Sequence, residues 1–282
     1  MANKNILKVN HDSTGIQAGG NVYIGLSYDD IKQIFFDLFN ANFPKLQEVA
    51  STEIQNRINF LWQEILIELE KNKNTIDINK FSDPNIQFEL AQISTNTARY
   101  GNQKNYNLLA KLLTKQLDKN CEDFNEQIAG ECLNLVPKLT YNRINLLVLF
   151  SICENLCLSK DNNEKDDDLP LIVESDLNKY IDIIKPLENL DIGNISFLQT
   201  VNCIRRHSII IMGYVPNFIS SIPKFHKMMS KDILKFCVEN KLDNLRLILN
   251  LSKKFLSYFE LTEIGQFIAG TKILNLDENL KG

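Results

Sequence analysis

The sequence predicts a mainly α-helical protein that opens with one β-hairpin. Three observations predict this fold class. Apolar residues recur at helical spacing through most of the 282 residues, Gly and Pro separate these stretches, and strict alternation occurs only near the N-terminus. Spacings of three and four residues place apolar side chains on one helix face, whereas alternation places them on one face of a strand. We therefore expect a hairpin followed by a body of stacked antiparallel helices.

The hairpin is predicted from the segment around Gly19 and Gly20. Apolar residues alternate on both sides of this pair, at Ile16, Ala18, Val22 and Ile24. Two alternating runs joined by a Gly-containing turn are typical of a β-hairpin. A hairpin of two strands is marginally stable alone and has unpaired edges, so it must pack on its own helices or pair with neighbouring subunits.

We expect pairing between subunits, which would make the protein a homo-oligomer. The small side chains around the turn would allow close approach of two hairpins. The predicted oligomerisation site consists of Ile16, Gln17, Ala18, Gly19, Gly20, Asn21, Val22 and Ile24.

The helices of the first half are predicted from apolar stripes between capping and breaking residues. Ser27 begins the first helix and Pro44 breaks it, while Asp83 and Pro84 begin a helix that Gly101 ends. Further helices are predicted over 54–69, 108–117, 124–135 and 144–157. The last of these is apolar on all sides, which is typical of a buried central helix. Trp62 lies in an apolar stripe and is expected in the core.

The second half is predicted to contain helices with clear N-terminal signals. They cover 176–190, 195–212, 231–239, 244–255 and 263–273, and Ser230, Asp243 and Thr262 are the expected N-caps. A polar, acidic stretch separates the two halves. We therefore predict a hairpin element at 1–26, a helical domain at 27–158, an acidic linker loop at 159–175, and a C-terminal helical domain at 176–282 packed on the first.

Composition excludes some classes of partner. Lys and Arg number 31 against 35 Asp and Glu, so the chain lacks the basic excess of a nucleic-acid coat, and nucleic acid is not an expected partner. The N-terminus shows no signal peptide. The longest uncharged stretch, Ser208–Pro223, is too short to span a membrane. The sequence therefore predicts a cytoplasmic protein, and membrane contact is not favoured.

The residues that usually carry catalysis form no recognisable motif. His11, His207 and His226 stand apart, the six cysteines include no CxxC pair, and phosphate-binding glycine motifs are missing. The cysteines are expected to be small buried hydrophobes. Glu64, Asp83, Glu89 and Glu131 show no spacing that pairs them for acid–base chemistry. Arg205, Arg206 and His207 are expected at the charged end of a helix. We therefore expect no catalytic residues, no metal site and no cofactor, which favours a non-enzymatic protein.

Several segments, taken in order, resemble a known family. They are the IQAGG segment at 16–20, FSDPNIQ at 81–87, ARYG at 98–101, VPKLT at 136–140 and LTEIGQFIA at 261–269. Together they resemble an uncharacterised bacterial family known only by locus-tag names. The N-terminal element is similar to one on bacterial proteins thought to belong to antiphage or other conflict systems. The resemblance implies a helical body and a defence setting, and it supplies no catalytic residues.

These observations predict a non-enzymatic, self-assembling helical protein. It would serve as a scaffold, adaptor or sensor in a bacterial antiphage defence or stress system, with a protein of that system as partner. Two alternatives stay open. One is a membrane-active or toxin-like effector whose segment Ile209–Ile222 is held inactive in the helical fold. The other is a metal-dependent nuclease whose site is assembled from distant carboxylates.

Overall fold

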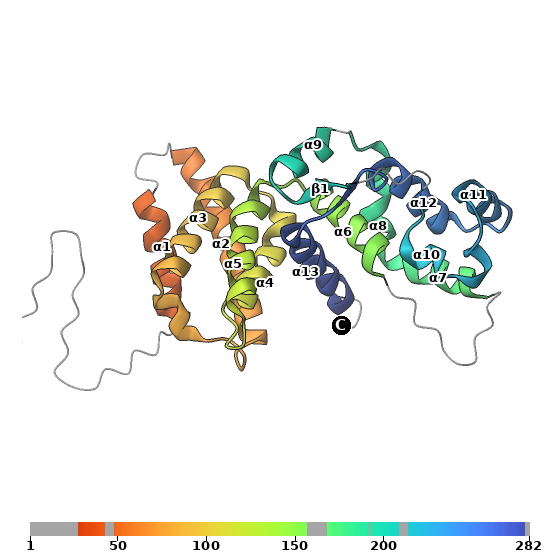
Figure 1. Ribbon diagram of the computed structural model, residues 1–282. Helices are drawn as coiled ribbons and strands as arrows, with labels where there is room; N and C mark the ends of the chain where they lie inside the picture. Colours follow the sequence, from red (N-terminus) through yellow and green to blue (C-terminus); the bar gives the residue numbers. More distant parts are fainter. Residues whose placement is uncertain (1–27, 43–47, 157–167, 192, 209–213, 280–282) are drawn as a thin grey trace, which may run out of the picture.

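The computed structural model describes residues 28–42, 48–156, 168–191, 193–208 and 214–279, and these residues are mainly helical (Figure 1). The helices lie side by side along an elongated body, with the N-terminal helices at one end (Figure 1). The predicted helical fold class is confirmed. The predicted hairpin and its eight oligomerisation residues lie outside the described residues.

The first half consists of helices packed next to their neighbours in sequence. They are α1 (Tyr28–Asn42), α2 (Glu48–Lys71), α3 (Pro84–Tyr100), α4 (Tyr106–Gln116) and α5 (Asp123–Leu135), with short 3₁₀ helices η1 (Ile78–Ser82), η2 (Gln103–Asn105) and η3 (Val136–Lys138) between them. α2 packs against α3 and α4, α4 packs against α5, and α1 covers α3. Phe35 and Trp62 pack ring against ring in this core, with centroids 5.5 Å apart, so the expected position of Trp62 is confirmed.

Both predicted ends of α3 are confirmed. The side chain of Asp83 accepts a hydrogen bond from the Asn85 N–H at 2.7 Å, and Pro84 occupies the first turn. At the other end Gly101 has φ 61°, a conformation that favours glycine. The guanidinium of Arg57 lies against Gly101, and its Nη1 donates to the Ala98 carbonyl oxygen at 2.8 Å. A side chain at Gly101 would therefore strain the backbone and displace Arg57.

Helix α6 (Tyr141–Asn155) is the buried central helix that its composition predicts. Every residue from Ile144 to Cys153 is buried. It packs against α8, α10, α12 and α13, which are all elements of the second half. Because other elements surround this helix, apolar side chains are buried on all of its faces.

The second half contains shorter elements. They are α7 (Leu169–Leu177), η4 (Asn178–Tyr180), α8 (Ile181–Ile184), η5 (Lys185–Asn189), α9 (Gly193–Thr200), α10 (Asn217–Ser220), η6 (Pro223–Phe225), α11 (Ser230–Glu239), α12 (Asp243–Phe255) and α13 (Glu263–Asn279). α13 stands between the two halves of the body and packs against α4, α5 and α6 (Figure 1).

The predicted helix over 195–212 is wrong for residues 201–208, and its last part, 209–212, lies outside the described residues. Asn202 has φ 56°, and the Cys203 N–H donates to the Leu198 carbonyl oxygen at 2.9 Å. This Schellman arrangement ends α9. The chain then forms β1 (Ile204–Arg206), which pairs antiparallel with β2 (Phe259–Leu261). The missed signal is an asparagine that tolerates the left-handed conformation.

Arg205 and Arg206 therefore lie on a strand and not at the end of a helix. Arg205 pairs across the ladder with Glu260, whose Oε1 accepts from Arg205 Nε at 2.8 Å. His207 lies beside the same carboxylate, with its Nδ1 3.4 Å from Glu260 Oε2. Arg205 and His207 thus lie beside a carboxylate of the neighbouring strand, whereas Arg206 lies over the ring of Phe259.

Other predicted boundaries also shift. Residues 169–175 of the predicted linker belong to α7, and Leu169, Val173 and Leu177 are buried there. Ser230 and Asp243 are the first residues of α11 and α12 and form no side-chain cap. Thr262 does cap α13, because its Oγ1 accepts from the Gly265 N–H at 3.3 Å.

The N-terminus of α12 is capped from another helix. Glu174 on α7 accepts from the backbone N–H groups of Asn244 at 2.7 Å and Leu245 at 2.9 Å. A carboxylate at a helix N-terminus accepts hydrogen bonds from the free backbone N–H groups and interacts favourably with the positive end of the helix dipole. No local pattern could have shown this contact.

Candidate functional site

A cavity of about 490 Å³ lies between α3 and α5. α3 contributes Asn85, Phe88 and Glu89, while Phe124, Ile128, Glu131 and Asn134 are among the lining residues of α5. Within each helix these residues recur every three or four positions, so each set faces the neighbouring helix. The cavity is therefore built from matching faces of two helices.

Glu89 is the most deeply buried charged group of this cavity, with 6% of its surface exposed. Its Oε1 accepts a hydrogen bond from Asn85 Nδ2 at 3.0 Å, and its Oε2 has no partner among the described residues. Burial raises the pKa of this carboxyl, and the nearby Glu126 and Glu131 add to the rise, while the Gln116 and Asn85 amides oppose it. The site thus holds a carboxylate that lacks both solvent and a cation.

Gly130 on α5 explains how Glu89 fits between the helices. A Cβ atom at this position would lie within 2.4 Å of Glu89 Oε1. Glycine inside a helix costs about 1 kcal/mol relative to alanine, so its presence calls for a packing reason. Here the reason is the close approach of the Glu89 carboxylate to the backbone of α5.

Further polar atoms around the cavity lack partners. Gln116 at the end of α4 is fully buried, and neither its Oε1 nor its Nε2 forms a well-aligned hydrogen bond with another described group, although its amide lies close enough to Glu89 to lower the pKa of that carboxyl. Asn134 Oδ1 is also unpaired. A buried polar atom without a partner costs about 1–3 kcal/mol. A bound donor group that satisfied the unpaired oxygens would recover part of that cost.

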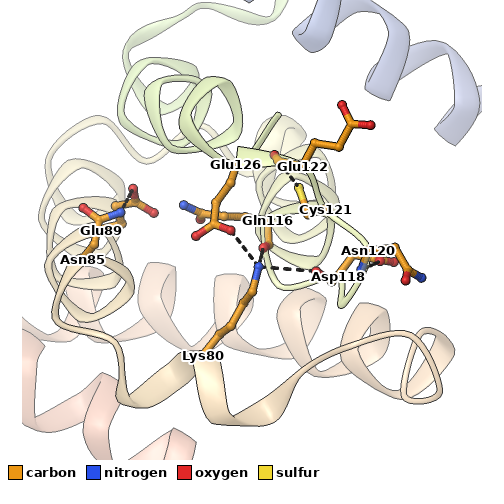
Figure 2. A network of polar contacts seen from close by, with 9 residues as sticks. All are labelled: Lys80, Asn85, Glu89, Gln116, Asp118, Asn120, Cys121, Glu122 and Glu126. Carbon is orange, nitrogen blue, oxygen red and sulfur yellow. Dashed lines mark hydrogen bonds and ion pairs between the residues drawn. The ribbon is translucent and has the colours of Figure 1, made fainter. Parts of the chain in front are cut away.

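Lys80 on η1 holds the frame of the site together (Figure 2). Its Nζ donates to Glu126 Oε2 at 2.7 Å, to the Gln116 carbonyl oxygen at 3.0 Å and to the Asp118 carbonyl oxygen at 3.4 Å. The ammonium group thereby ties the C-terminus of α4 to the first turn of α5. A cation at a helix C-terminus also complements the helix dipole.

The connection between α4 and α5 is tied by local contacts as well. Asp118 accepts from the Asn120 N–H at 2.7 Å, and Cys121 Sγ lies 3.8 Å from the Glu122 carbonyl oxygen (Figure 2). Lys80 pairs with Glu126, which lies beside the cavity. The two carboxylates that line the cavity itself, Glu89 and Glu131, have no cationic partner among the described residues.

Two exposed aromatic side chains line the cavity. Phe88 on α3 is 59% exposed and Phe124 on α5 is 61% exposed. Aromatic faces attract cations, and buried carboxylates attract them more strongly. The arrangement can therefore bind a cationic group with several N–H donors.

No pattern in the sequence indicated this cavity. Four carboxylates were considered in the sequence. Glu64 accepts a hydrogen bond from Asn107 Nδ2 at 2.9 Å and Asp83 caps α3, whereas Glu89 and Glu131 line the same cavity. Two carboxylates with no pairing spacing in the sequence, Glu89 and Glu131, are thus brought to one cavity by the packing of α3 against α5. The available signal was Gly130, a glycine inside a predicted helix.

The expectation of buried cysteines is confirmed for four of the five that the structure describes, and Cys121 is partly exposed. Four are buried: Cys132, Cys153, Cys203 and Cys237. Burial raises the pKa of Cys203 to about 12 and that of Cys237 to about 11, which keeps these thiols protonated. Within the described ranges, no three His, Cys, Asp or Glu side chains come close enough together to hold a metal ion.

The comparisons with known proteins place the chain in a family. Residues 25–245 match the model of an uncharacterised family with a locus-tag style name, whose description reads ":-like". Because the match spans well over half of the chain, the protein belongs to this family. No curated protein and no solved structure matches it. Every helix in the described part of the chain is too short or too polar to span a membrane.

Proposed function

We propose that this protein is a non-enzymatic, self-assembling binding protein of a bacterial antiphage defence or stress system. In this proposal the cavity between α3 and α5 takes up a basic side chain of a protein partner. The observation that carries the proposal is the buried Glu89 carboxylate, which has one free oxygen and lies in a cavity lined by two exposed phenylalanines.

The chemistry of the cavity favours arginine or lysine as the captured group. A guanidinium offers five N–H donors in a plane, and an ammonium offers three. The unpaired acceptors Glu89 Oε2 and Asn134 Oδ1 are buried, so the side chains of Glu89 and Asn134 would turn toward the cavity to receive these donors. Phe88 and Phe124 would cover the apolar stem. The cation would also stabilise the ionised form of Glu89. Affinity should therefore increase with pH as Glu89 ionises.

A binding role is favoured over a catalytic one by the lining of the cavity. No His, Cys, Ser, Thr or Lys side chain is among its described lining residues. A nucleophile next to a base is the usual sign of covalent catalysis. The cavity offers acceptors and aromatic faces, which are typical of recognition.

The assembly role rests on the alternating segment around Gly19 and Gly20, and the defence setting rests on the resemblance of that segment to other bacterial proteins. A scaffold or adaptor needs one surface for its own copies and another for a partner. The hairpin would supply the first and the α3–α5 cavity the second.

The capture of a basic side chain can be tested with three blocked pentapeptides that differ only in a central Arg, Lys or Leu. We expect the Arg and Lys peptides to shift the NMR signals of Asn85 and Phe88, with Kd values near the millimolar range for so small a ligand. Glu89→Gln should abolish this preference. Glu64→Gln, which changes a carboxylate outside the cavity, is the matched control. Equal binding of the Leu peptide would contradict the proposal.

Self-assembly can be tested by measuring the mass in solution of the full chain and of a chain lacking residues 1–26. We expect a defined oligomer for the first and a folded monomer for the second, with circular dichroism confirming the fold. A full-length protein that stays monomeric at all concentrations would exclude assembly through the hairpin.

A further inference from the structure

A second cavity, of about 420 Å³, lies where α13 packs against the C-terminal part of α6. Its lining is largely apolar and includes Ile152, Leu156, Phe267, Ile273 and Leu274. Small-molecule sites usually measure about 300–1,000 Å³ and are mostly apolar with a few polar groups. The cavity therefore has the size and lining of a small-molecule site.

Gly270 on α13 keeps this cavity open. A Cβ atom at this position would meet nothing within 4 Å, and the backbone of Gly270 does not adopt a positive φ. Neither a close approach nor a turn requires glycine here, although glycine weakens a helix by about 1 kcal/mol relative to alanine. The space above Gly270 belongs to the cavity, so a side chain there would partly fill it.

Lys115 on α4 supplies a positive charge to the apolar cavity. Its Nζ lies 5.0 Å from the ring centroid of Phe267, and it has no carboxylate partner among the described residues. Burial lowers the pKa of Lys115, and the positive charge of Lys111 lowers it further. A desolvated ammonium group without a counter-ion favours an anionic ligand.

A smaller cavity of about 100 Å³ adjoins this end and shares Lys115, Thr271 and Leu274 with the larger one. Lys111, which is 6% exposed, lines it, and so does the carboxylate of Glu68, which already pairs with Lys71 at 2.9 Å. The apolar space therefore continues into a polar end, where Lys115 lies between the two cavities.

We propose that the cavity between α6 and α13 binds a fatty acid, with the hydrocarbon chain against Ile152 and Phe267 and the carboxylate beside Lys115. An apolar chamber with one cationic end matches a single-chain amphiphile with one anionic head. The cavity volume limits the hydrocarbon chain to medium length. This site is separate from the α3–α5 cavity and does not depend on the function proposed for it.

The test compares dodecanoate, dodecanol and dodecylammonium, each below the concentration at which it forms micelles. Titration calorimetry on the full chain should show dodecanoate binding at least tenfold more tightly than dodecylammonium. Shorter carboxylates should bind about fourfold more weakly for each CH₂ removed. Equal affinity for the two charged amphiphiles would overturn the proposal.

Variants locate the binding site. Gly270→Leu should fill the cavity and reduce dodecanoate and dodecanol binding at least tenfold, while thermal melting confirms that the protein remains folded. Lys115→Gln should weaken the binding of dodecanoate about tenfold and leave the affinity for dodecanol unchanged. Lys231→Gln, at an exposed lysine on α11, is the control and should change neither.

A charge reversal keeps the test decisive if Gly270→Leu does not fold. Lys115→Glu changes a half-buried side chain at the polar end and should reverse the preference, so that dodecylammonium binds more tightly than dodecanoate. A merely structural lysine would not produce this reversal. A folded Lys115→Glu protein that retains the original preference would overturn the proposal.

Discussion

The two cavities of this protein use the same residue type for opposite purposes. Each has a glycine inside a helix, Gly130 on α5 and Gly270 on α13. A Cβ at Gly130 would lie 2.4 Å from Glu89 Oε1, whereas a Cβ at Gly270 would meet nothing within 4 Å. The first glycine lets a side chain approach the helix backbone, and the second leaves space unfilled. An interior glycine therefore indicates a special contact or a vacant volume, and only the neighbouring elements decide which.

The cavities also differ in charge. The α3–α5 cavity has a buried carboxylate with a free oxygen, and the α6–α13 cavity has a lysine without a carboxylate partner among the described residues. Burial shifts both groups toward their neutral forms, raising the pKa of Glu89 and lowering that of Lys115. Two sites on one helical body are thus suited to ligands of opposite charge.

The largest effect is expected when the contact at Gly130 is broken. Gly130→Leu places a bulky side chain where the Glu89 carboxylate lies, and overpacking of this kind costs about 2–3 kcal/mol. Urea denaturation should show that loss in the free energy of unfolding. An unchanged urea midpoint would mean that α3 and α5 can move apart to accommodate the new side chain. Gly130 would then not be required by a close contact, and it would not differ from Gly270 in this respect.

A smaller loss is expected from Lys80→Met, which removes the ammonium group that ties α4 to α5. The variant leaves two carbonyl oxygens and Glu126 without their shared donor, at a cost of about 1–2 kcal/mol. Lys73→Met is the matched control, because Lys73 and Glu70 are both more than half exposed and ion pairs at such positions contribute little to stability. Equal losses of unfolding free energy in the two variants would show that the Lys80 contacts stabilise the fold no more than an exposed ion pair does.

Gly270→Ala is expected to stabilise the protein. Alanine replaces glycine inside α13 without meeting any atom, so helix propensity should add about 0.5–1 kcal/mol to the free energy of unfolding. Thermal and urea unfolding would both reveal the gain. A destabilised variant would contradict the conclusion that the space above Gly270 is vacant.

The smallest effect concerns pH and Glu89. Its pKa is raised in the folded protein, so the folded state binds the proton more tightly than the unfolded chain does. Glu89 therefore destabilises the fold above its folded pKa, and this penalty disappears below the unfolded value near 4.5. Glu89→Gln should melt at a higher temperature than the natural protein at pH 7.5, with the difference vanishing near pH 4. Glu131→Gln, at an exposed position, should show little change.

Much of the fold could be predicted because its signals are local. Asp83, Pro84 and Gly101 set the two ends of α3, and the apolar composition of 144–157 predicted the buried central helix. These signals work because capping and periodicity depend on residues within one or two turns. The end of α9 was missed because Asn202 in a left-handed conformation is a weaker signal than glycine.

The sites could not be predicted because their parts come from different helices. Glu89 and Glu131 are on α3 and α5, and periodicity describes only which residues share a face of one helix. Lys115 and Gly270 line one cavity only because α13, at the end of the described chain, packs against α4. Pairing of distant helices is decided by packing of whole faces, which a single sequence does not display.

The position of α13 has a consequence for the order in which the chain can fold during synthesis. α5 and α6 are complete at Asn155, yet the helix that packs on both begins at Glu263. At about 5–20 residues per second, the ribosome needs roughly 5–20 s to produce the intervening chain. For that time the partner faces of α5 and α6 remain uncovered on the nascent chain. Chaperone contact during translation is therefore expected to concentrate on these two helices and to end when α13 leaves the exit tunnel.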